Sequence, residues 1–169
     1  MNVIIKYLIR FLVFAIVQIF ILNEIEFGFG IHIMLYPLFT MLLPFEIGTL
    51  SLLLLSFFMG FLIDIFCNTY GLHASSLLML AYFRPIIFNI FSPRDGYDPI
   101  KEPSILDMGG RWFLLVYGNL LLIHHFWFFL IEVFRIDQFL FIFQSTILSL
   151  IISCLVSIII QVLLIKKTK

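Results

Sequence analysis

Charged residues are scarce in this chain, making up 12% of its 169 residues, whereas 63% are hydrophobic and the mean hydropathy is +1.17. A soluble domain of this length cannot bury so much apolar surface, because its core accommodates only part of the chain. A lipid bilayer removes this difficulty by surrounding the protein with an apolar solvent. The composition therefore excludes an ordinary water-soluble domain and indicates an integral membrane protein.

The sequence also lacks the short motifs on which common enzyme classes depend. It contains no phosphate-binding glycine loop, no G-x-S-x-G and no H-E-x-x-H pattern. Its two cysteines, Cys67 and Cys154, form no C-x-x-C pair. The adjacent His124 and His125 would point about 100° apart on a helix, which disfavours a shared metal ion. We therefore expect a non-enzymatic protein with no catalytic residue, no metal site and no cofactor.

Long apolar runs fill most of the chain, and one helical crossing of a bilayer needs about 20 such residues. The runs are continuous rather than alternating, so they predict helices and not the strands of a barrel. We predict one all-α domain over residues 1–169, a compact bundle of six transmembrane helices with one longer loop at 92–110. The predicted spans are 7–22, 29–43, 48–67, 72–91, 112–134 and 139–165.

Basic residues are distributed unevenly between the two sides of this six-span arrangement. Arg135 falls on one side and Arg84 within a span, whereas the other side receives Lys6, Arg10, Arg94, Lys101, Arg111, Lys166, Lys167 and Lys169. The positive-inside rule assigns the richer side to the cytoplasm. We therefore expect a multi-pass protein of a cytoplasmic membrane, with both termini and loop 92–110 in the cytoplasm.

Small or polar residues recur at every fourth position in two of the predicted spans. In span 48–67 they are Ser56, Gly60, Asp64 and Asn68. In span 139–165 they are Ser145, Ser149, Ser153, Ser157 and Gln161. Such a stripe allows close approach of helices and lets polar groups find partners across the contact. Both stripes are therefore predicted to face protein, either within the chain or in a second membrane protein.

Two charged residues lie inside predicted spans. Asp64 is costly there, since insertion scales give on the order of 3 kcal/mol for a charge deep in a span. One interpretation is an internal hydrogen-bonded lock to the following turn, for example to Thr69, Tyr70 or His73; the other is a contact, proton or ligand site. For Arg84 we predict a structural role, with its long side chain reaching toward Glu46.

A short motif suggests a family. The segment Gly60-Phe-Leu-Ile-Asp64, followed by Gly71-Leu-His-Ala74, resembles the signature of the MreD family of bacterial rod shape-determining membrane proteins. The stretch Ser-Pro-Arg-Asp-Gly-Tyr-Asp-Pro at 92–99, followed by Met108-Gly109, is similar to the version found in Bacteroidota. The resemblance implies a six-helix fold like that of the substrate-binding S-components of energy-coupling-factor transporters.

The same resemblance implies a function in cell elongation. Members of that family are non-enzymatic subunits of the rod-shape complex in the bacterial inner membrane, where they bind the scaffold protein MreC. Through MreC they are linked to MreB filaments, the RodA glycosyltransferase and a class B penicillin-binding transpeptidase, and so to peptidoglycan synthesis and cell shape. By this analogy Gly60, Asp64 and Gly71 would shape the bundle or its partner surface.

A transporter subunit is the alternative, because the implied fold is that of proteins that bind a vitamin or metal ion from outside. Such a protein needs a polar pocket between the outer helix ends. The polar residues near that face are Asn23, Glu24, His32, Asp64, Asn68, His73 and Glu132. A membrane enzyme acting on lipid is a third class, and the chain offers no motif for it.

Overall fold

The computed structural model describes residues 3–25, 28 and 30–165, and within these residues it contains helices and no β-strand. The first helix, α1 (Val3–Val17), continues as a π-helical turn, η1 (Gln18–Leu22). The remaining elements, in chain order, are α2 (Pro37–Met41), α3 (Thr49–Cys67), α4 (Leu72–Ile90), α5 (Ile105–Met108), α6 (Gly110–Val133), a 3-10 turn η2 (Ile136–Gln138) and α7 (Phe139–Ile165).

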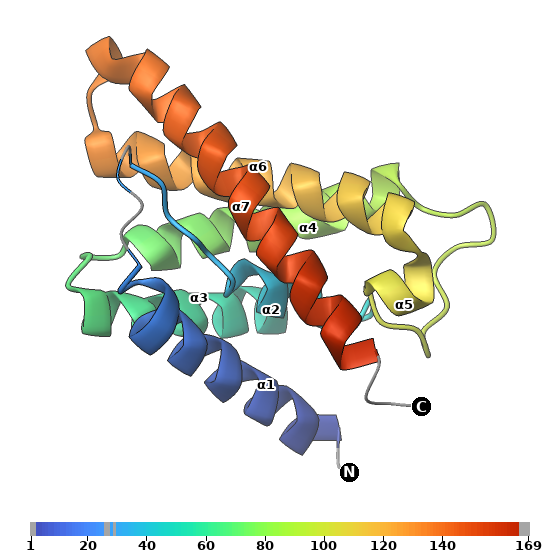
Figure 1. Cartoon of the computed structure of the whole chain (residues 1–169). Coiled ribbons are helices and arrows are strands. Elements are labelled where there is room, and N and C mark those ends of the chain that lie inside the picture. Colours follow the sequence, from blue (N-terminus) through green and yellow to red (C-terminus); the bar gives the residue numbers. More distant parts are fainter. Residues whose placement is uncertain (1–2, 26–27, 29, 166–169) are drawn as a thin grey trace.

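Four of the helical segments are long and apolar enough to cross a membrane: Ile5–Leu22, Thr49–Cys67, Gly110–Val133 and Phe139–Leu163. The chain is thus a helical membrane protein. Helix α4 is as long as α3, at 19 residues, but it carries His73, Arg84 and an internal Pro85 and is less apolar. It packs between α3 and α6, and its His73 and Arg84 side chains are buried against protein (Figure 1).

The second apolar run differs from the continuous helix predicted for 29–43, since residues 31–35 are non-helical and only Pro37–Met41 forms a short helix. Gly28 and Gly30 precede this stretch with φ of +70° and +68°, a conformation that ends regular helix. Pro37 stands at the start of α2, where its missing N–H costs nothing. Residue 29 lies outside the described residues. We call residues 31–43 the central segment.

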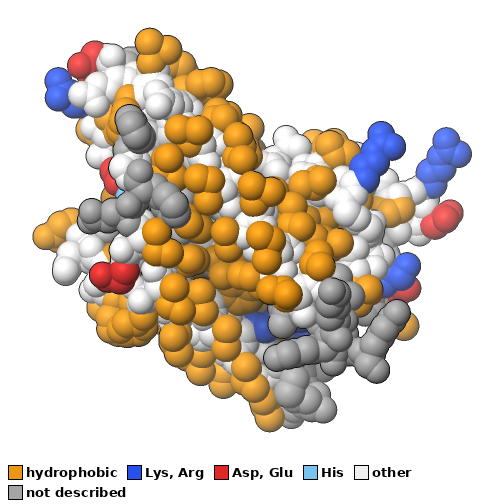
Figure 2. All heavy atoms as spheres, in the orientation of Figure 1, with side chains coloured by type: hydrophobic (Ala, Val, Ile, Leu, Met, Phe, Trp, Pro, Cys, Tyr) orange, Lys and Arg blue, Asp and Glu red, His pale blue; other side chains and the backbone are white. Residues whose placement is uncertain are grey.

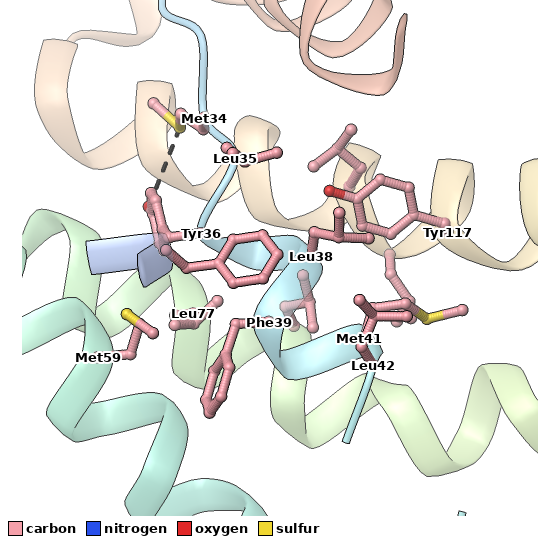
Figure 3. Close-up of a cluster of buried hydrophobic side chains, with 14 of the residues drawn as sticks. Met34, Leu35, Tyr36, Leu38, Phe39, Met41, Leu42, Met59, Leu77 and Tyr117 are labelled. Carbon is pink, nitrogen blue, oxygen red and sulfur yellow. Dashed lines mark hydrogen bonds between the residues drawn. The ribbon is translucent and has the colours of Figure 1, made fainter. Parts of the chain in front are cut away.

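The central segment runs through the middle of the bundle, and residues 33–43 are all buried (Figure 1). Figure 3 shows its side chains packed among α3, α4 and α6, where they meet Met59, Leu77 and Tyr117. Its apolar character therefore reflects burial in protein and not contact with lipid. Hydropathy reports both environments identically, which is why the helix prediction failed here.

The bundle has two distinct ends. At the basic end, Lys6 and Arg10 both pair with Glu102 in the long loop, and the amide of Gln161 in α7 accepts a hydrogen bond from the N–H of Ile105. The turn end carries the connections at 68–71 and 134–138 (Figure 1). In Figure 2 charged side chains gather mainly at these ends, and apolar side chains cover the surface between them.

Candidate functional site

The central segment is held in place by hydrogen bonds from side chains. The Ser149 hydroxyl accepts from the N–H of His32 at 3.0 Å, and the Ser153 hydroxyl accepts from the N–H of Met34 at 2.9 Å. These side chains replace the backbone partners that a helix or sheet would supply. A non-helical stretch is tolerated at membrane depth only when protein satisfies its polar groups in this way.

Gln18 performs the same task from the opposite side. Its amide nitrogen donates to the carbonyl of Ile33 at 2.9 Å, and its amide oxygen accepts from the N–H of Leu35 at 2.7 Å. Gln18 is fully buried and opens the π-helical turn η1, whose altered pitch is typical of functionally constrained positions in helices. A single amide thus fixes the register between the first helix and the central segment.

Tyr36 lies at the centre of a buried polar cluster. Its hydroxyl lies 2.9 Å from Nδ1 of His73 in α4 and 2.7 Å from Nε2 of His124 in α6. Nδ1 of His124 has no partner among the described residues. Since an unpaired buried N–H is rarer than an unpaired acceptor, we assign the proton to Nε2, which donates to Tyr36, while Tyr36 donates to His73.

Asp64 joins α3 to α4. Its Oδ1 accepts from the Thr69 hydroxyl at 2.5 Å and from the His73 N–H at 3.0 Å, and its Oδ2 accepts from the Ala74 N–H at 2.9 Å. The last two donors belong to the first turn of α4, where N–H groups have no partner inside the helix and a negative charge is favourable. The predicted lock to Thr69 and His73 is confirmed, whereas Tyr70 is fully exposed.

Gly60 places the two helices of this hairpin in direct contact. A Cβ atom at this position would lie 2.5 Å from Cα of Ala74 and 2.7 Å from the carbonyl carbon of His73. Those atoms are backbone and cannot move aside, so only glycine fits. One turn earlier, the buried Ser56 hydroxyl lies 3.1 Å from the Thr40 hydroxyl in the central segment. At the end of the stripe, Asn68 is exposed and adopts the left-handed conformation that ends α3.

The serine stripe of α7 faces the interior of the chain. Ser145, Ser149, Ser153 and Ser157 are all buried. Ser157 lies 3.1 Å from the Tyr117 hydroxyl, Ser153 lies 3.2 Å from Nε2 of His125, and Ser145 lies beside Gly30. The question that the sequence left open, whether this stripe meets the chain itself or a second protein, is thereby answered. The stripe binds α6 and the central segment.

Arg84 is 2% exposed and lies near the basic end. The predicted partner, Glu46, is wrong. Nη2 of Arg84 instead donates to three backbone carbonyls at and just after the end of α2, those of Met41, Leu43 and Pro44. The guanidinium lies over the Phe88 ring, with 4.4 Å between Cζ and the ring centroid. These carbonyls are available because the last carbonyls of a helix have no partner inside the helix.

A surface groove runs between α3 and α4 at the turn end. Its volume is about 550 Å³, and mainly apolar side chains line it, among them Phe57, Phe61, Ile65 and Leu78. Asp64, Asn68, Gly71 and Ala74 also line it. Phe61 is 46% exposed and Ile65 55% exposed, so the groove is open to the surroundings of the bundle. Asp64 and Gly71 line the groove, and Gly60 lies in the same α3–α4 hairpin.

Several of the polar residues considered for a transporter pocket are engaged in contacts with other residues of the chain. Asp64 and His73 are buried and engaged in the hairpin, whereas Asn23 donates to Cys67. Nε2 of His32 lies 3.9 Å from Oε1 of Glu132, both partly exposed. Among the described residues, no three His, Cys, Asp or Glu side chains are arranged to hold a metal ion.

Fold and composition together define a helical membrane protein with a buried central segment, whose backbone is hydrogen-bonded by side chains of the neighbouring helices. No protein-family model, curated protein or solved structure matches the chain. The residues that sequence reasoning missed are Gln18, Tyr36 and His124. Gln18 could have been found from the sequence, because a single amide inside a predicted transmembrane span requires a hydrogen-bond partner within the protein.

Proposed function

We propose that this protein is a non-enzymatic membrane subunit that binds the transmembrane helix of a partner in the groove between α3 and α4. The observation that carries the proposal is the groove itself. It is apolar, it is open along the surface, and it follows two packed helices, as expected for docking of a third helix. Two small residues in its lining, Gly71 and Ala74, allow a close approach.

The resemblance to the MreD family supports a specific partner. The residues that carry it, Gly60, Asp64 and Gly71, build or line the α3–α4 hairpin. By this reading the occupant is the single transmembrane helix of an MreC-type scaffold. The chain would then act in the rod-shape complex of a bacterial inner membrane, linked to MreB filaments, RodA and a class B transpeptidase.

We further propose six crossings of the membrane, with five made by helices and the second made by the central segment. This arrangement keeps both termini and loop 92–110 on the basic, cytoplasmic side. It is supported by the contacts of Lys6 and Arg10 with Glu102 and by the burial of residues 33–43. Cysteines introduced as Lys101→Cys and Gln138→Cys should react with an impermeant thiol reagent from opposite sides of the membrane. Labelling of both from the same side would refute the six-crossing arrangement.

The test of the partner is a mild-detergent purification of the full chain from its native membrane, followed by mass spectrometry. Recovery of a single-span periplasmic scaffold and cell-wall synthases is the expected result. Leu78→Trp fills the groove and should lower recovery of the scaffold by about tenfold, the effect of losing ~1.4 kcal/mol. Leu155→Trp, on the exposed face of α7, is the control and should leave recovery unchanged. Equal recovery with both variants would exclude the groove.

The alternative function is that of a substrate-binding S-component of an energy-coupling-factor transporter. The observation that favours it is the partly exposed pair of His32 and Glu132 near the turn end, where a substrate would enter. The same purification separates the two functions. Recovery of paired ATPases with a coupling membrane subunit, and no scaffold, would establish transport of a vitamin or metal ion.

A further inference from the structure

A second cavity lies near the basic end, far from the groove. Its volume is about 250 Å³, and its walls combine aromatic rings with polar side chains; the residues used below are Thr49, Arg84, Asn89 and Tyr97. Pockets for drug-sized ligands usually measure roughly 300–1,000 Å³. The cavity is therefore suited to a small group, such as the head of a larger molecule whose remainder lies outside.

Arg84 brings an uncompensated positive charge to this cavity. No ion pair among the described residues includes Arg84; its charge is met by backbone carbonyls through Nη2 and by the face of the Phe88 ring, and not by an anion. Its Nε has no hydrogen-bond partner in the described part of the chain, although the side chain is almost completely buried. A buried cation normally has an anionic partner, so the fold leaves one missing.

The start of α3 opens onto the same cavity. Thr49 is its first residue, and the first backbone bond of the helix runs from the N–H of Leu52 to the carbonyl of Gly48. No side chain caps this N-terminus. The N–H groups of the first turn therefore remain available, and the helix dipole favours an anion there.

Two further donors complete the cavity. Thr49 and Asn89 line it at its exposed side, and neither makes a side-chain hydrogen bond to another described residue. The aromatic wall is closed by Phe45 stacked on Tyr97, with ring centroids 4.3 Å apart. This combination provides donors and positive charge on one side and an aromatic surface on the other.

We propose that this cavity binds a phosphate group, held by Arg84, the N-terminus of α3 and the side chains of Thr49 and Asn89. Arg is suited to phosphate because its planar guanidinium offers several donors in a fixed geometry. The phosphate belongs either to the head of an anionic lipid or to free inorganic phosphate. The cavity lies near the basic end of the bundle, beside loop 92–110, and in the proposed orientation this is the level of the lipid head groups.

The experiment uses the full chain in detergent, probed by native mass spectrometry with phosphatidylglycerol or phosphatidylcholine and by thermal unfolding with inorganic phosphate. Asn89→Asp places a carboxylate in the cavity without removing the Arg84 bonds, and it should weaken binding by about tenfold or more through like-charge repulsion. Gln138→Glu makes the same change of charge at the exposed turn end and should leave binding unchanged.

The outcomes separate the two sources of phosphate. Retention of phosphatidylglycerol over phosphatidylcholine, lost in Asn89→Asp, supports a lipid head. Protection by inorganic phosphate with no lipid preference, also lost in Asn89→Asp, supports free phosphate. Thr49→Val tests the same site without added charge and should weaken binding by about threefold. Binding of neither probe, or equal binding by Asn89→Asp and Gln138→Glu, would overturn the proposal.

Discussion

Two charged side chains are buried near opposite ends of this bundle, and the fold satisfies them to different degrees. Asp64 near the turn end accepts hydrogen bonds from three donors, two of them backbone N–H groups of α4. Arg84 near the basic end is held through Nη2 alone, and its Nε has no partner among the described residues. A buried charge whose hydrogen bonds are all made within the protein, such as Asp64, stabilises the fold. A buried charge with an unpaired donor, such as Arg84, is a candidate for binding a ligand.

The largest effect is expected from removing the charge of Asp64. Asp64→Ala leaves the N–H groups of His73 and Ala74 buried without an acceptor. Since each such group costs about 1–3 kcal/mol, we expect a loss of roughly 2–6 kcal/mol of unfolding free energy. Asp64→Asn keeps one acceptor oxygen and should lose less. Thermal or denaturant unfolding in detergent measures both. Equal stability of Asp64→Ala and wild type would show that the carboxylate does not lock the hairpin.

The next effect tests whether the hairpin depends on close approach as well as on charge. Gly60→Ala forces a Cβ to within 2.5 Å of the Ala74 backbone, and overpacking of this kind costs about 1–3 kcal/mol. Gly118→Ala is the matched control in α6, because its Cβ would meet no atom within 4 Å. It should be neutral or stabilising by up to ~1 kcal/mol, the helix propensity difference. A cost at Gly118 equal to that at Gly60 would contradict the steric argument.

The Asp64 side of the comparison could be predicted from the sequence, and the Arg84 side could not. Asp64 lies one turn before the end of a helix and is followed by Thr69 and a tight turn, so its partners are local. Arg84 is satisfied by carbonyls that lie about 40 residues earlier. Carbonyls at a helix C-terminus lack partners inside the helix, but nothing in the sequence indicates that Arg84 contacts this particular helix end.

The stripes illustrate the same limit. Four-residue spacing correctly predicted that Ser149 and Ser153 face protein. It did not predict that their partners are the N–H groups of His32 and Met34, because the prediction placed those residues in a hydrogen-bonded helix. The signal that the sequence did offer was the set of polar side chains in the neighbouring spans, Gln18 and the α7 serines. Polar side chains inside apolar spans need hydrogen-bond partners, and the backbone of a non-helical segment can supply them.

The smallest effect is expected for Glu102, a partly exposed carboxylate in the loop at the basic end that pairs with Lys6 and Arg10. Burial raises the pKa of Glu102, but hydrogen bonds and charges from Lys6 and Arg10 outweigh it, so the pKa falls below its ordinary value of 4.5. A carboxylate with a lowered folded-state pKa stabilises the fold above its unfolded pKa, and this contribution is lost as the pH falls through the folded value. Stability should therefore decrease below about pH 4.5, by up to ~1 kcal/mol for a partly exposed pair, and Glu102→Gln should abolish that part of the decrease. An identical acid profile for Glu102→Gln and wild type would show that loop 92–110 is held at the basic end by other contacts, such as the one between Gln161 and Ile105.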